Sequence, residues 1–306
     1  MTFAVLCPGQ GAQHPRMLDL YAGHPAAEAV LASGADALGV HVREWLARAD
    51  SIHDNAIAQP LLCLAQRAAW AALCEAAPAP LAFAGYSVGE LAAHGCAGAL
   101  AADELARLAR ARAAAMDAAC PAGGGLIALR GIGRAGADAL CAALGAHVAI
   151  VNGDDAFVIG GAAAGMERIG VQAAQGGATV TCLKVAVPAH TPLLAAAVAP
   201  FRRALEASAL RAPDVPVVAG IDGTLVTTRS LAIAALSAQL ARTIVWSRCL
   251  EALYERGCRV FLELGPGNAL SRMARERLPA GVEARALADF RTLDGVTQWL
   301  RRRTGG

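Results

Sequence analysis

The chain has 306 residues, 56% of them hydrophobic and 17% charged, which indicates a globular protein large enough for one α/β domain with a smaller insert. A net charge of +2, with 27 basic and 25 acidic residues spread along the chain, argues against a nucleic-acid surface, and nine cysteines without a C-x-x-C pair argue against a metal or disulfide framework. We expect a cytoplasmic protein, because no apolar run reaches the roughly 18 residues of a membrane span and no basic leader opens the chain.

The first predicted element is an apolar strand, Thr2 to Cys7, which runs into the loop Pro8-Gly9-Gln10-Gly11-Ala12-Gln13. A phosphate cradle is not indicated, because the loop has neither a G-x-G-x-x-G pattern nor a following Walker lysine. A glutamine between two glycines is suited to presenting an amide and a backbone N–H to a small polar group. A plain β-turn is an equal alternative for this segment alone.

A long helix is predicted from Ile57-Ala58-Gln59-Pro60 through Trp70 to Ala76. Proline is acceptable in the first turn of a helix, so this start places Gln59 at the helix entrance. The segment Ala77-Pro78-Ala79-Pro80 ends the helix and delivers the chain to the next strand.

A short apolar strand, Leu81 to Ala84, precedes Gly85-Tyr86-Ser87-Val88-Gly89-Glu90, which has the G-x-S-x-G form of a nucleophile elbow. The two glycines would let the strand and the following helix approach closely. The helix N-terminus would leave the N–H of Val88 free to face an oxyanion. The alternative is a glycine-rich turn with an incidental serine.

Beyond the elbow, a helix is predicted over Asp103 to Ala119. Arginines on such a helix ordinarily lie on its solvent-exposed face, and this is the ordinary interpretation of Arg112. Residues 123–186 then read as β-α-β-β-α-β, the order of a ferredoxin-like subdomain. We therefore predict an α/β fold with two domains: an α/β-hydrolase-like core with a parallel sheet, residues 1–122 and 187–306, and the inserted ferredoxin-like subdomain, residues 123–186.

The chain returns to the core through Val187-Pro188-Ala189-His190-Thr191-Pro192, where flanking prolines fix the backbone around His190. His94, one helical turn after the elbow, competes with it as a partner for Ser87. A last core strand, Arg259 to Leu264, ends in another glycine-rich loop, at the edge of the sheet where α/β proteins place their sites.

Taken together, these loops resemble those of the malonyl-CoA:acyl-carrier-protein transacylase family. The matching segments occur in the family's order across almost the whole chain: Pro8 to Gln13, Gly85 to Glu90, Arg112 with Met116, Val187 to His190, and Glu263 to Gly267. Tyr86, in place of a more usual histidine, and the segment Asp289 to Val296 look most like the malonyl-transferring epsilon subunit of malonate decarboxylase.

The resemblance implies a role for each matching residue. Ser87 would attack the thioester, His190 would take its proton, and the N–H groups of Val88 and Gln10 would hold the oxyanion. Arg112 would bind the free carboxylate of malonyl. A main-chain carbonyl that orients the histidine maps to Val245, and Gln59 and Asn152 complete the predicted substrate-binding set.

The function expected is a ping-pong acyltransferase that moves malonyl from malonyl-CoA, through a Ser87 acyl-enzyme, to the phosphopantetheine-type thiol of an acyl carrier protein. The expected context is a malonate decarboxylase and its other subunits, and the alternative is fatty-acid or polyketide synthesis. Malonyl-CoA is the substrate; no permanently bound cofactor or metal, nucleic acid or membrane is implied. A serine thioesterase and a non-catalytic docking subunit are the remaining alternatives.

Overall fold

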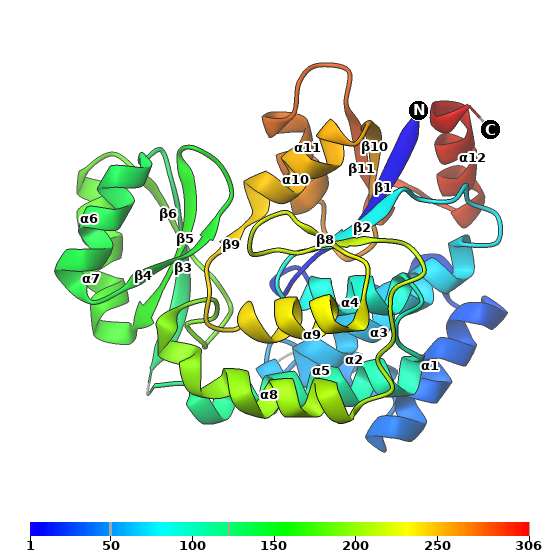
Figure 1. Cartoon of the computed structure of the whole chain (residues 1–306), viewed down its shortest axis with the longest axis horizontal. Coiled ribbons are helices and arrows are strands. Elements are labelled where there is room, and N and C mark those ends of the chain that lie inside the picture. Colours follow the sequence, from blue (N-terminus) through cyan, green and yellow to red (C-terminus); the bar gives the residue numbers. More distant parts are fainter. Residues whose placement is uncertain (49–50, 122, 306) are drawn as a thin grey trace.

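The computed structural model describes residues 1–48, 51–121 and 123–305 and contains two β-sheets (Figure 1). The larger sheet has the strand order β11-β10-β1-β2-β7-β8. Its strands are parallel up to β7, and only β8 runs antiparallel to its neighbour. The bounds are β1 Thr2–Cys7, β2 Ala82–Gly85, β7 Val217–Val218, β8 Leu225–Val226, β10 Cys258–Glu263 and β11 Glu283–Ala286.

Helices cover both faces of the large sheet, as a parallel sheet with buried strands requires. In Figure 1, α3, α4 and α5 lie on one side of the strands, while α10 and α11 lie on the other. The remaining helices are arranged around this core. The bounds are α1 Pro25–Leu38, α2 Val42–Leu46, α3 Asn55–Leu73, α4 Val88–Cys96, α5 Ala102–Ala119, α8 Ala195–Ala207, α9 Arg229–Ala238, α10 Trp246–Glu255, α11 Ala269–Arg277 and α12 Leu293–Thr304, with short 3₁₀ turns η1 Asp19–Tyr21, η2 Pro192–Leu194 and η3 Leu287–Asp289.

The smaller sheet has the strand order β6-β3-β5-β4-β9 and stands apart from the large one in Figure 1. Its first four strands and two helices follow the β-α-β-β-α-β order predicted for residues 123–186. They enclose a separate apolar core that includes Phe157, Ile159 and Ile169. The bounds are β3 Gly124–Arg130, α6 Arg134–Leu144, β4 His147–Val151, β5 Ala156–Ala162, α7 Ala163–Gln175, β6 Thr179–Cys182 and β9 Ile244–Val245.

Strand β9 joins this sheet from far along the chain. It pairs in parallel with β4, with Ile150 opposite Ile244 and Val151 opposite Val245. The small sheet therefore extends beyond the predicted subdomain and is hydrogen-bonded to a segment of the core. Ala122, at the predicted domain boundary, and Gly306, at the predicted end of the core, lie outside the described residues.

Helix α3 begins earlier than the sequence predicts. It starts at Asn55, so Pro60 lies inside the helix and Gln59 lies in its second turn, fully buried. The prediction of Pro60 in the first turn was wrong because Asp54, not a residue near Ile57, stands just before the first helical turn. A proline inside a helix removes one intrahelical hydrogen bond.

In the described part of the chain, no helix combines the length and apolar character that a bilayer crossing demands. All nine cysteines are free thiols, and six of them are buried: Cys7, Cys63, Cys96, Cys141, Cys249 and Cys258.

Candidate active site

Ser87 occupies a tight turn between β2 and α4, at the carboxyl edge of the large sheet. Its backbone has φ 58° and ψ −121°, a conformation that L-residues rarely adopt. The flanking glycines allow the turn: a Cβ on Gly85 would lie 2.1 Å from the backbone of Gly89 and Glu90, and one on Gly89 would lie 2.0 Å from the carbonyl oxygen of Cys7. The close approach predicted for the two glycines is therefore confirmed.

His190 has the second unusual backbone of the molecule. Among the described residues, Ser87 and His190 are the two non-glycine residues with positive φ, and the value at His190 is 63°. The N–H of His190 donates to the carbonyl of Leu240 at 2.9 Å. The hydroxyl of Thr191 donates back to the carbonyl of Pro188 at 2.7 Å, which closes the loop. Strained residues of this kind cluster at functional sites.

The side chains of these two residues meet. His190 Nε2 lies 2.8 Å from Ser87 Oγ, and His190 Nδ1 lies 2.6 Å from the main-chain carbonyl oxygen of Gln239. A carbonyl can only accept, so Nδ1 carries the ring proton and Nε2 is left to accept from the serine hydroxyl. His94 is not a partner, because neither of its ring nitrogens has a hydrogen-bond partner among the described residues.

The residue whose carbonyl orients the histidine is Gln239, so the assignment of this role to Val245 was wrong. Val245 lies in β9, where its N–H donates to the carbonyl of Gly220 at 2.8 Å. The error arose because a main-chain acceptor leaves no side-chain signature in a sequence.

The imidazole is kept neutral. Burial lowers the pKa of His190 to about 3, and the nearby positive charge of Arg112 acts in the same direction, while the bond to the Gln239 carbonyl opposes it. A neutral ring at physiological pH is the form that can accept a proton from Ser87.

Two backbone N–H groups, those of Val88 and Gln10, belong to segments that adjoin Ser87. Val88 is the first residue of α4, so its N–H has no acceptor within the helix. The loop that carries Gln10 is held by a hydrogen bond from Gln66 Nε2 to the carbonyl of Pro8, 2.9 Å long. A Cβ on Gly9 would lie 3.5 Å from Ser87 Cβ, so this loop packs directly against the serine.

Arg112 is fully buried on α5, where its guanidinium contacts only neutral groups. Nη1 donates to Gln59 Oε1 at 2.8 Å and to Met116 Sδ at 3.2 Å, and Nη2 donates to Gln239 Oε1 at 3.2 Å. Its Nε has no partner, and it forms no ion pair within the described residues. Burial lowers its pKa to about 10, so the group remains charged at neutral pH.

The buried carboxyl of Glu90, which the sequence analysis did not identify, lies near this arginine. Glu90 Oε2 accepts from Gln239 Nε2 and from the N–H of Gly220, both at 2.9 Å, and Oε1 has no partner among the described residues. Burial raises the pKa of Glu90 to about 8. The one available signal was an acidic residue in the first turn of an otherwise apolar helix.

Asn152 lies in the turn between β4 and β5, where its Oδ1 accepts from the Tyr86 hydroxyl at 3.1 Å. The Tyr86 ring packs edge-on against Trp246, with centroids 5.4 Å apart. Asn152 thus connects the small sheet to the elbow through Tyr86, and no direct hydrogen bond joins it to Ser87 or His190.

Between the core and the small sheet lies a cleft of about 830 Å³, lined among others by Gln10, Asn55, Cys120, Lys184 and Val187. Its volume is in the range of small-molecule sites. It reaches the Gln10 loop that packs against Ser87, and Val187 belongs to the loop of His190.

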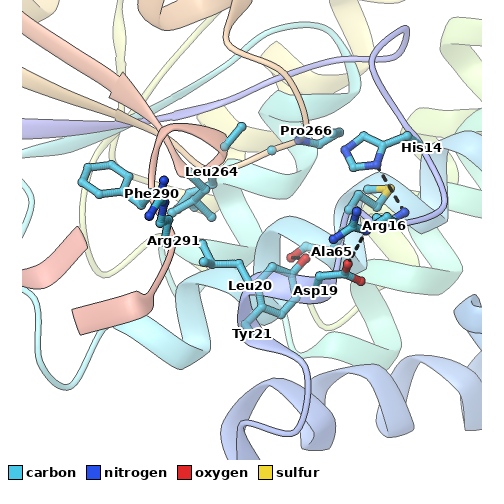
Figure 2. Close-up of a pocket in the computed structure, with 14 residues that line it drawn as sticks. His14, Arg16, Asp19, Leu20, Tyr21, Ala65, Leu264, Pro266, Phe290 and Arg291 are labelled. Carbon is cyan, nitrogen blue, oxygen red and sulfur yellow. Dashed lines mark hydrogen bonds and ion pairs between the residues drawn. The ribbon is translucent and has the colours of Figure 1, made fainter. Parts of the chain in front are cut away.

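A separate cavity of about 570 Å³ lies over the ends of β10 and β11. Figure 2 shows His14 and Arg16 on one side of it and Phe290 and Arg291 on the other. Arg16 is paired with Asp19 at 2.8 Å. Ser87, His190 and Arg112 line neither of the two hollows. The cleft adjoins them through Gln10, whose loop packs against Ser87, and through Val187 of the His190 loop, so the candidate active site lies beside the cleft.

Comparisons with known proteins identify the family of the chain. The acyl transferase domain model matches residues 4–290. The malonyl CoA-acyl carrier protein transacylase of Mycobacterium bovis is 31% identical over 297 residues, which cover 95% of this chain and 98% of the relative.

Two solved structures extend the comparison. The malonyl CoA-acyl carrier protein transacylase of Coxiella burnetii superimposes with a TM-score of 0.92 at 28% identity, over 99% of this chain and 98% of that one. A malonyl-transacylase in complex with its type II PKS acyl-carrier protein gives a TM-score of 0.90 at 29% identity, over 97% of this chain and 99% of that one. The chain belongs to the acyl transferase domain family, the family of the malonyl-CoA:acyl-carrier-protein transacylases.

Proposed function

We propose that this chain transfers malonyl groups from malonyl-CoA to the thiol of an acyl carrier protein. The observation that carries the proposal is the environment of Arg112, a fully buried cation with no carboxylate partner among the described residues. Arg112 donates to the side chain of Gln239, and the main-chain carbonyl of the same glutamine holds the histidine beside Ser87. A buried, unpaired cation lowers the stability of the fold unless a bound anion pairs with it. The free carboxylate of malonyl supplies that anion, and acetyl does not.

In the proposed reaction, His190 Nε2 takes the proton of Ser87 as Oγ attacks the thioester carbonyl. The N–H groups of Val88 and Gln10 stabilise the oxyanion, each such donor contributing about 10²–10³ in rate. The tetrahedral intermediate expels the CoA thiolate, which receives the proton from His190. The carrier thiol then attacks the malonyl-serine by the same steps, so the chain's own groups carry the whole ping-pong cycle.

The three remaining residues have supporting roles in the proposal. Gln59 orients Arg112 through a 2.8 Å hydrogen bond, and Asn152 reaches the site through Tyr86. Val245 has no direct role, because the carbonyl that holds His190 belongs to Gln239.

The partner we propose is a carrier protein with a phosphopantetheine-type arm. The relatives named as malonyl CoA-acyl carrier protein transacylases, and the complex with a type II PKS carrier, support transfer in fatty-acid or polyketide synthesis. A place in a malonate decarboxylase, with its other subunits as partners, rests only on Tyr86 and the segment 289–296. We therefore favour the synthetic context, in the cytoplasm.

We also propose that the fold divides as the sequence suggests, into an α/β-hydrolase-like core and a ferredoxin-like subdomain over residues 123–186. Support comes from the mainly parallel large sheet with Ser87 at a strand-to-helix turn, and from the β6-β3-β5-β4 order of the small one. The pairing of β9 with β4 attaches a piece of the core to the subdomain.

The test is the intact mass of the protein after brief mixing with malonyl-CoA or acetyl-CoA, for the wild type and Ser87→Ala. We expect one malonyl adduct that requires Ser87 and forms much more slowly from acetyl-CoA. Release of CoA without a lasting adduct would instead favour a thioesterase. No reaction with either donor would favour a docking subunit.

A further inference from the structure

One amide lies between a buried guanidinium and a buried carboxyl group. Gln239 Oε1 accepts from Arg112 Nη2 at 3.2 Å, and Gln239 Nε2 donates to Glu90 Oε2 at 2.9 Å. The side chains of all three residues are fully buried. The amide is oriented so that its oxygen faces the cation and its nitrogen faces the carboxyl, which is the one orientation that satisfies both neighbours.

In this arrangement the guanidinium of Arg112 and the carboxyl of Glu90 do not form a direct ion pair. Because burial raises the pKa of Glu90 to about 8, its carboxyl is mostly protonated at neutral pH in its present place, one amide away from Arg112. In direct contact the guanidinium would favour the ionised form, since opposite charges attract strongly in a low-dielectric interior and a carboxylate can accept two parallel N–H bonds from a guanidinium. A direct contact between Arg112 and Glu90 would use those N–H groups. Instead, the guanidinium retains an Nε–H and one of its two Nη2 hydrogens without a partner among the described residues.

The guanidinium and the carboxyl are both anchored on their far sides. The N–H of Gly220 donates to Glu90, and a Cβ on Gly220 would lie 2.8 Å from the carboxyl oxygen, so the backbone fits closely there. Arg112 is held by Gln59, whose amide nitrogen donates in turn to Asn55 Oδ1 at 2.5 Å. The only side chain that hydrogen-bonds to both the guanidinium and the carboxyl in the described structure is that of Gln239.

We propose that the side chain of Gln239 is a positioning residue that keeps Arg112 apart from Glu90, so that the guanidinium stays available to the carboxylate of the acyl group. This inference rests on the proposed malonyl transfer. It gives Gln239 two separate tasks, because its main-chain carbonyl orients His190 while its side chain keeps the carboxylate-binding site open.

The sharpest test exchanges the two side chains in the double variant Glu90→Gln, Gln239→Glu. The exchange keeps the amino-acid composition, but it puts the carboxylate directly against Arg112. We expect the rate of Ser87 acylation by malonyl-CoA to fall at least about 10-fold relative to that by acetyl-CoA. The KM for malonyl-CoA should rise, and the thermal midpoint should stay close to that of the wild type.

A purely structural network predicts a different result, namely equal changes for both donors. A malonyl-to-acetyl rate ratio equal to that of the wild type, in a folded exchange variant, would overturn the inference. If wild-type protein forms no malonyl adduct, the proposed function itself fails. The two failures are therefore distinguishable.

A second pair of variants covers the case in which the exchange variant does not fold. Gln239→Met removes the amide at similar size and lets Arg112 move to Glu90, so the malonyl-to-acetyl ratio should fall. Adding Glu90→Gln removes the carboxylate that captures the guanidinium, and the ratio should recover. Absence of that recovery would also overturn the inference.

Discussion

The two ends of the proposed active site, a reacting end at Ser87 and His190 and a carboxylate end at Arg112, are built by different means. At the reacting end, Ser87 and His190 are positioned by backbone: two positive φ angles, a main-chain carbonyl that accepts from the ring, and free N–H groups. At the carboxylate end, Arg112 is positioned by the side chains of Gln59, Met116 and Gln239. The reacting end should therefore be sensitive to the path of the chain, and the carboxylate end to the chemistry of each side chain.

The largest effect is expected from a change in chain path at the reacting end. Gly89→Ala would place a Cβ 2.0 Å from the carbonyl oxygen of Cys7, so α4 must move away from β1. We expect a loss of roughly 1–3 kcal/mol in unfolding free energy, and loss of Ser87 acylation from both donors, measured by intact mass. The control is Gly133→Ala, because a Cβ there meets nothing within 4 Å. Retained acylation in Gly89→Ala would show that the reacting end tolerates a change of path.

A smaller effect, confined to one donor, is expected from the most conservative change at the carboxylate end. Arg112→Lys keeps the charge but loses the planar fork that binds a carboxylate through two N–H groups. Malonyl-CoA acylation should fall about 10-fold to 100-fold, and acetyl-CoA acylation should change much less. Arg110→Lys, on the same helix but bonded to the Leu38 carbonyl, is the matched control. Equal losses with both donors would contradict the distinction between the two ends.

The smallest effect on activity is expected from His94→Leu, a change on α4 that belongs to neither end. The wild-type ring is fully buried, and both its nitrogens lack partners among the described residues. Leucine should raise the unfolding free energy at neutral pH by about 1 kcal/mol or more. Acylation rates should not change.

The same variant has a pH signature. Burial lowers the pKa of His94 to about 4, from the roughly 6.5 of an exposed histidine. Between these values the unfolded chain binds the proton and the folded chain does not, so stability falls as the pH falls, by on the order of 3 kcal/mol in full. Urea unfolding at about pH 7 and about pH 5 should show a smaller loss in His94→Leu than in the wild type. Equal losses would mean that His94 is not the titrating group.

The reacting end could be anticipated from sequence because its determinants are local. A strand, a G-x-S-x-G turn and a helix specify the environment of Ser87 within a few residues, and prolines mark the loop of His190. The choice of His190 over His94 came from the family resemblance, and the 2.8 Å contact with Ser87 agrees with it.

The rest depended on contacts between distant segments. Gln239 was missed because it acts on His190 through its backbone, and Glu90 because its partners come from positions 220 and 239. Strand β9 is two residues long, too short for any alternation of apolar and polar residues to reveal it. Arg112 was identified only by resemblance, since nothing in a helical arginine reveals that it is buried.

The segment from Gln239 to Val245 has a consequence for how such enzymes can diversify. Its first two carbonyls hold His190, and its last two residues pair with β4 of the small sheet. An insertion or deletion within it would shift the general base and one wall of the cleft together. The length of this connecting segment is therefore constrained twice, once by the histidine and once by the pairing with β4.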